Sequence, residues 1–306
     1  MKIRRRDICG GAIGVAAGIA GASMTGHAFG RSSYSGTASS VTVHIDGLVR
    51  VVESNGLPDH HVGEFPSRHD PFGVRPQRHR LQMPCEPVSN DLPIPLDMWW
   101  FGVALNGVPF DPSGPFWNGQ TASGWQFEVM HPANSIALGI DRNNAHTQIG
   151  GMYHYHGLPS GLLAQRMSAD QAHAMQLVGY AADGYPIYGP ECPAAPDDLE
   201  SPLRRLRSSY RLSAAPRQGG PGGKPDGRFV EDYIYDPEYG DLDQCNGRFG
   251  VTPEFPGGTY YYALTDGFPS IPRFFHGIPD QSFKHGPPPG ASAPVPPELR
   301  GYRGTG

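Results

Sequence analysis

Short alternating stretches dominate the pattern of apolar and polar positions. Residues 41–52 alternate around Asp46-Gly47, a turn dipeptide, and therefore predict a β-hairpin. Residues 153–156, Tyr-His-Tyr-His, predict a strand with its tyrosines on one face and its histidines on the other. Helical patterns are confined to residues 169–177, which follow a capping-box pattern, and residues 197–208. The pattern predicts an all-β or β-rich fold with one or two short helices.

Three sequence blocks recur in the same order, which indicates an internal repeat. The matched blocks are residues 102–109 with 179–186, 141–146 with 243–248, and 150–156 with 257–263. We expect two pseudo-symmetric repeats, at about 93–160 and 175–285, packed as one sandwich-like domain. The spacing between matched blocks grows along the chain, so an insertion is expected in the second copy.

The first 28 residues have the features of an export signal. Lys2 and three arginines precede an apolar stretch, and Gly26-His27-Ala28 is a small-residue cleavage site. The Arg5-Arg6 pair is typical of twin-arginine signals, so we expect export by the twin-arginine machinery to the periplasm or the exterior. No other apolar stretch is long enough to span a membrane, so no membrane association is expected after cleavage.

The remaining chain divides by composition into three parts. Residues 29–92 are expected to form an N-terminal β extension, residues 93–285 the main domain, and residues 286–306 a disordered tail rich in Pro and Gly.

The 42 glycines and 33 prolines oppose an all-helical protein. A net charge of −5 gives no electrostatic basis for nucleic-acid binding. Among the cysteines beyond the signal, Cys192 and Cys245 are the favoured disulfide pair because they share one repeat.

Histidines distinguish the two copies. The first copy carries His146, His154 and His156, and the matching residues of the second copy are Arg248, Tyr261 and Ala263. If the fold required these histidines, the second copy should keep some of them. Their absence there points to a site in the first copy alone. Arg248 would be a candidate anion-binding group opposite that site if the copies pack face to face.

The spacing of the three histidines suits a metal ion. His154 and His156 share a strand face, and a turn at Gly150-Gly151 would bring His146 alongside them. Three imidazoles with an open fourth position suit zinc or copper and resemble catalytic zinc sites. Glu128 and Asp183 are candidate general bases for such a site. The alternative is a group of histidines that form hydrogen bonds on a wet sheet face.

Several longer motifs carry a family resemblance. They are Asn-Asn-Ala-His at 143–146, Gly-Met-Tyr-His-Tyr-His-Gly-Leu-Pro at 151–159, Gly-Tyr-Ala-Ala-Asp-Gly-Tyr-Pro-Ile-Tyr-Gly at 179–189, and Asp-Leu-Asp-Gln-Cys-Asn-Gly-Arg at 241–248. With them the chain resembles the YHYH-domain family of exported bacterial proteins. Family members often have a second histidine-bearing strand, where this chain has Tyr-Tyr-Tyr-Ala at 260–263. The resemblance implies an exported protein and brings no activity with it.

Two functions from different classes follow. The first is an exported metal-binding protein with a zinc or copper site, for which a metal-dependent hydrolase and a non-catalytic binder both remain open. The second is a metal-free module that binds carbohydrate or another polymer through aromatic faces. The aromatic residues that favour it are Trp99, Trp100, Trp117, Trp125, Tyr260, Tyr261 and Tyr262. Whether the ligand is a small molecule or a polymer stays open.

Overall fold

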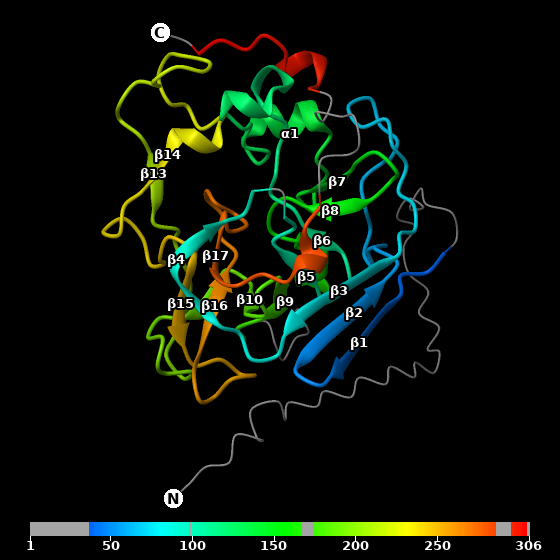
Figure 1. Cartoon of the computed structure of the whole chain (residues 1–306), viewed down its shortest axis with the longest axis vertical. Helices are drawn as coiled ribbons and strands as arrows, with labels where there is room; N and C mark the ends of the chain where they lie inside the picture. The colour runs from blue at the N-terminus through cyan, green and yellow to red at the C-terminus, as the bar shows by residue number, and fades with distance from the viewer. Residues whose placement is uncertain (1–36, 98, 167–173, 286–294, 305–306) are drawn as a thin grey trace, which may run out of the picture.

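The structure, a computed structural model, describes residues 37–97, 99–166, 174–285 and 295–304 (Figure 1). Strands far outnumber helices among these residues, which confirms the predicted β-rich fold. The expected signal segment, residues 1–28, lies outside the described residues. Within the described part of the chain, no helix has both the length and the apolar character needed to cross a membrane.

An eight-stranded mixed sheet forms the centre of the molecule. Its strand order is β15-β16-β10-β9-β5-β6-β8-β7. The strands are β5 (Gly102–Ala104), β6 (Pro109–Phe110), β7 (Ala145–Thr147), β8 (Tyr153–Tyr155), β9 (Leu177–Ala181), β10 (Pro186–Tyr188), β15 (Gly247–Gly250) and β16 (Thr259–Ala263). Figure 1 shows β15 and β16 at one side of this sheet and β7 and β8 at the other.

The two halves of this sheet have the same arrangement. In each half an antiparallel pair, β5 with β6 or β9 with β10, lies beside a parallel strand, β8 or β16, and an antiparallel edge strand, β7 or β15. The turn before each edge strand holds an asparagine at φ 56°, Asn144 in one half and Asn246 in the other. The halves lie side by side in one sheet, joined by β5 and β9. A common origin of the halves stays a prediction.

The N-terminal hairpin lies where the sequence predicts it. Strands β1 (Val41–Asp46) and β2 (Val49–Ser54) pair around Gly47, and β3 (His79–Pro84) extends them to a three-stranded sheet. Val52 from β2 and Leu81 and Met83 from β3 are buried in the same apolar cluster as the central sheet. The N-terminal segment therefore shares the core of the domain that follows.

Smaller elements surround the central sheet. The further strand pairs are β4 (Ser89–Pro95) with β17 (Phe274–Gly277), β11 (Glu191–Pro193) with β12 (Leu203–Arg205), and β13 (Tyr210–Leu212) with β14 (Tyr233–Tyr235). The α-helices of the described residues are α1 (Pro132–Leu138) and α2 (Ser160–Arg166). Single 3₁₀ turns are η1 (Trp117–Gly119), η2 (Thr121–Ser123), η3 (Val230–Asp232), η4 (Gln281–Phe283) and η5 (Pro297–Leu299).

Among the described residues, short helices occur at positions other than those predicted. The helix expected at residues 197–208 is wrong: Pro202 cannot continue a helix, and Arg204 and Arg205 lie on strand β12 instead. Both arginines form ion pairs at the surface, Arg204 with Asp241 and Arg205 with Asp266. Residues 169–173 of the other predicted helix lie outside the described residues.

Two further expectations need correction. Cys192 and Cys245 form no disulfide, because each thiol is buried in a different apolar cluster. In the segment expected to be a disordered tail, residues 295–304 pack onto the domain. Val295 and Leu299 are buried against the cluster that contains Phe127. The Pro-rich composition of the segment gave no indication that these two apolar side chains are buried.

Candidate metal centre

The β7–β8 hairpin brings the three histidines together. His146 on β7 pairs directly with His154 on β8, and His156 follows two residues later on the same face. Tyr153 and Tyr155 occupy the opposite face and are fully buried in the core. The side-chain alternation of a strand thus separates the imidazoles from the phenol rings, as predicted.

The three imidazole rings form a compact triangle. Their centroids lie 4.9 Å apart for His146 and His154, 4.9 Å for His146 and His156, and 4.6 Å for His154 and His156. One nitrogen of each ring lies within 4.8 Å of the others. Among the described residues this is the group of side chains arranged to hold a metal ion.

Backbone carbonyls fix two of the rings. Nδ1 of His146 lies 2.8 Å from the carbonyl oxygen of Leu138, and Nδ1 of His154 lies 3.2 Å from that of Met152. A carbonyl can only accept, so each Nδ1 carries the proton and donates it. The Nε2 lone pairs of His146 and His154 are therefore free for an ion, and the second ring nitrogen has the acceptor that metal-bound histidines usually have.

His156 has the least satisfied ring. Both of its nitrogens are buried and neither makes a hydrogen bond of normal geometry, although the Pro112 carbonyl lies near enough to favour the protonated ring slightly. A buried polar atom without a partner costs free energy, which a ligand at this position would recover. The unpaired nitrogens of His156 are therefore available to a ligand.

Burial keeps the imidazoles neutral. Desolvation lowers the pKa of His154 to about 4, and the pKa of His156 lies well below its ordinary value. The pKa of His146 is lowered by the same cause, against the opposing charge of Asp70, whose carboxylate lies 3.7 Å from its Nδ1. Neutral imidazoles have the lone pairs that metal binding needs. The His146 side chain is 14% exposed, so the group is open to solvent on that side.

Comparison with known proteins finds a family match over most of the chain. A family model described as YHYH protein matches residues 80–277. The chain belongs to the YHYH protein family. The match runs from within β3 to the end of β17, so it contains the central sheet and all three histidines. No curated protein and no solved structure matches the chain.

The carboxylates expected to act as general bases are both engaged by other groups of the YHYH domain. Glu128 is buried, and its two oxygens are engaged by the Met130 backbone N–H at 3.0 Å and the Arg273 guanidinium at 2.5 Å. Asp183 lies on the turn between β9 and β10, in the other half of the sheet, and accepts from the Tyr262 hydroxyl and the Gly277 N–H. The structure brings the three histidines together. The oxygens of Glu128 and Asp183 are all engaged by other groups of the protein.

Asp111 is a neighbour of the histidines that sequence reasoning missed. It follows β6, and its N–H donates to the Tyr155 carbonyl of β8 at 2.9 Å. Its charge raises the pKa of His146 and of His154, against the effect of burial. The first matched block ends at Pro109, and extending it by two residues would have aligned Asp111 with Tyr188.

The other half of the YHYH sheet shows the same face without a site. Arg248 and Tyr261 pair there as His146 and His154 do here, and Ala263 pairs with Tyr188. Tyr188, Tyr261 and Ala263 belong to one buried apolar cluster. The fold therefore packs this face well with large rings, and it does not need histidines for stability.

The idea of Arg248 as an anion-binding group opposite the histidines is wrong. The halves lie side by side, so Arg248 on edge strand β15 and His146 on edge strand β7 are separated by the full width of the sheet. Seven strand spacings place them on the order of 30 Å apart along the sheet. The Arg248 guanidinium is also satisfied locally, by the Tyr261 hydroxyl at 2.6 Å and the Pro193 carbonyl at 2.6 Å.

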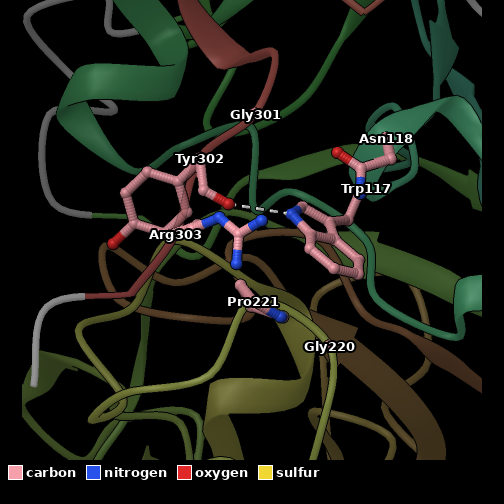
Figure 2. A pocket seen from close by; sticks show the side chains of 7 residues that line it. All are labelled: Trp117, Asn118, Gly220, Pro221, Gly301, Tyr302 and Arg303. Atoms are coloured by element: carbon pink, nitrogen blue, oxygen red, sulfur yellow. Dashed lines mark hydrogen bonds between the residues drawn. The ribbon is translucent and has the colours of Figure 1, made fainter.

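A separate cavity lies near the described C-terminal residues of the YHYH protein. Its volume is about 150 Å³, and none of the three histidines lines it. The lining residues are Trp117, Asn118, Gly220, Pro221, Gly301, Tyr302 and Arg303. Figure 2 shows the Trp117 indole N–H donating to the Tyr302 carbonyl oxygen, at 3.0 Å, with the Arg303 guanidinium beside them.

Proposed function

We propose that this YHYH protein is an exported metal-binding protein that holds one zinc or copper ion on His146, His154 and His156. The observation that carries the proposal is the convergence of three imidazole nitrogens within 4.8 Å of one another on a largely buried sheet face. Tetrahedral ligands at zinc–nitrogen distances stand about 3.3 Å apart. Small rotations of the three rings would close the difference.

The chemistry of the surroundings favours a divalent ion over an empty histidine cluster. Three neutral imidazoles buried without a ligand leave the nitrogens of His156 unsatisfied. Asp70 and Asp111 place carboxylates beside the rings, and these would balance the charge of a divalent ion. The donor set contains only nitrogen, which suits zinc and copper better than calcium or magnesium.

Three protein ligands leave one coordination position open. With zinc, a water at that position would become a nucleophile near neutral pH, and the protein would be a metal-dependent hydrolase. With copper, storage or electron transfer would be the natural role of the same ligands. The identity of the ion therefore decides which assay to apply.

The test is the metal content of untagged protein purified from the periplasm without chelators. We expect about one zinc or copper ion per chain, and none in a folded His154→Ala/His156→Ala variant. The matched control is His44→Ala/His61→Ala, which removes two exposed histidines and should keep the ion. Wild-type protein without stoichiometric metal, even after reconstitution with each ion, would contradict the proposal.

A metal-free carbohydrate-binding module is the second candidate. The cavity beside Trp117 is the observation in its favour, because an indole at a cavity wall can stack on a sugar ring. Tyr260, Tyr261 and Tyr262 no longer contribute, since they are at most 1% exposed. This candidate predicts polysaccharide binding that Trp117→Ala abolishes and a chelator leaves unchanged.

A further inference from the structure

Strand register places Asp111 on the histidine face. Phe110 of β6 pairs with Tyr155 of β8 in a parallel ladder, and their rings lie 5.6 Å apart on the core side. The next residues, Asp111 and His156, therefore stand side by side on the opposite face. Neighbouring strands are about 4.8 Å apart, so Asp111 lies on the face of the histidines, and its charge acts on His146 and His154.

The Asp111 carboxylate is buried but not saturated by the backbone. The residue is 3% exposed, and one oxygen accepts from the Ser113 N–H at 3.0 Å. The other oxygen lies 3.5 Å from Nε2 of His285, a partly exposed ring. Asp111 does not belong to the group of three histidines whose nitrogens lie within 4.8 Å of one another. It therefore lies near the metal position without being one of its three ligands.

The other half of the sheet again supplies the comparison. The residue that corresponds to Asp111 is Tyr188, whose hydroxyl donates to the Glu254 carboxylate at 2.6 Å and lies 2.7 Å from the Thr252 hydroxyl. All four positions of the face are thus different in the two halves: three histidines and Asp111 in one, and no carboxylate or imidazole in the other. Asp111 changes together with the histidines, which ties it to their site.

We infer that Asp111 is the fourth functional residue of the centre and accepts a hydrogen bond from the group bound at the open coordination position. This inference rests on the proposed metal site. A carboxylate at this point favours a ligand that can donate a hydrogen bond, such as water, an alcohol or an amine, and it repels an anion. Asp70 adds a second negative charge, and Arg273, paired with Glu128, places one positive charge within reach of His156. The two carboxylates outweigh this cation, so the centre is selective for neutral hydrogen-bond donors over anions.

The experiment uses the full mature chain loaded with Co²⁺, whose visible absorption reports the ligands of the ion, and azide as the anionic probe. The cobalt stoichiometry is measured first, and azide affinity is then measured by absorption titration. We expect Asp111→Asn to bind one cobalt ion as the wild type does and to bind azide about tenfold more tightly, because the repelling charge is gone. Asp91→Asn removes an equal charge from an exposed position and should leave azide affinity unchanged.

The outcomes separate this inference from the function it rests on. Wild-type protein that binds no cobalt would overturn the metal site itself. Stoichiometric cobalt with the same azide affinity in wild type and Asp111→Asn would overturn the role of Asp111 alone. If Asp111→Asn does not fold, Asp111→Ser serves instead, because serine can still accept from the Ser113 N–H but carries no charge.

Discussion

His146 and His154 face each other across the β7–β8 pair with ring centroids 4.9 Å apart, and both rings are oriented by backbone carbonyls. The carbonyls belong to Leu138, at the end of α1, and Met152, next to β8. Because neither acceptor is a side chain, the ring orientations follow from the backbone fold. The two Nε2 atoms are therefore held in place before an ion binds, which reduces the ordering that binding must impose.

Metal binding should stabilise the native protein. An ion present at about 100 times its Kd contributes about 2.7 kcal/mol to the free energy of unfolding. For a chain of this size the melting temperature should rise by roughly 4–5 °C. Differential scanning calorimetry of chelator-treated protein, with and without added zinc, measures the shift. His154→Ala/His156→Ala should show no rise, and an equal rise in that variant would place the ion elsewhere.

Asp183 should make stability depend on pH. Desolvation raises the pKa of its carboxyl from 3.8 to about 6, so the folded chain holds this proton more tightly than the unfolded chain. The stabilising contribution is complete below about pH 4 and is lost as pH rises through about 6. At about 1.4 kcal/mol per unit, the loss is on the order of 3 kcal/mol. In urea titrations, the difference in free energy of unfolding between wild type and Asp183→Asn should change by this amount from pH 4 to pH 8.

A second variant tests the cause of the Asp183 effect. The Tyr262 hydroxyl donates to the carboxylate and favours its charged form. Tyr262→Phe should therefore move the loss of stability to a higher pH. A difference curve between wild type and Asp183→Asn that is flat with pH would show that this carboxyl does not titrate in the range.

The two strands that join the halves should tolerate no side chain at their glycines. A Cβ at Gly179 would lie 2.3 Å from the Val103 carbonyl oxygen, and one at Gly102 would lie 2.4 Å from that of Tyr180. Gly179→Ala should lower the free energy of unfolding by about 1–3 kcal/mol, because the strands must move apart. Gly257→Ala, at a glycine with open space around it, is the matched control and should be neutral in the same chemical denaturation.

The Arg217–Asp232 pair should matter more than the surface pairs. Its side chains are 1% and 0% exposed and joined by two bonds of 2.7 Å. Arg217→Met leaves the Asp232 charge buried and should cost about 3–5 kcal/mol. Arg205→Met, which breaks an exposed pair with Asp266, should change stability by less than about 1 kcal/mol. Similar losses in the two variants, measured by urea unfolding, would contradict this difference.

The histidine cluster could be predicted because it depends on local rules. The two-residue period of a strand places His154 with His156, and the turn at Gly150-Gly151, with φ angles of 92° and 78°, returns the chain so that His146 pairs with His154. Both rules act within a dozen residues. The β-rich class followed for the same reason, since alternation and turn residues are short-range signals.

Asp111 could not be predicted in this way. It reaches the site through the parallel pairing of β6 with β8, and nothing in the sequence near Asp111 specifies which strand will lie beside it. The ion pair of Glu128 could not be predicted for a related reason, because its partner Arg273 comes from a distant segment beside β17. Non-local pairing decides which carboxylates have a free oxygen.

The filled face of the second half also provides a set of replacements. Tyr261, Ala263 and Tyr188 are residues that pack at positions corresponding to His154, His156 and Asp111 in a sheet of the same strand order. The chain thus contains, in its own sequence, an inactive version of its candidate site. Exchanges such as His154→Tyr with His156→Ala borrow from that version, and loss of metal in a chain that still folds could then be assigned to chemistry alone.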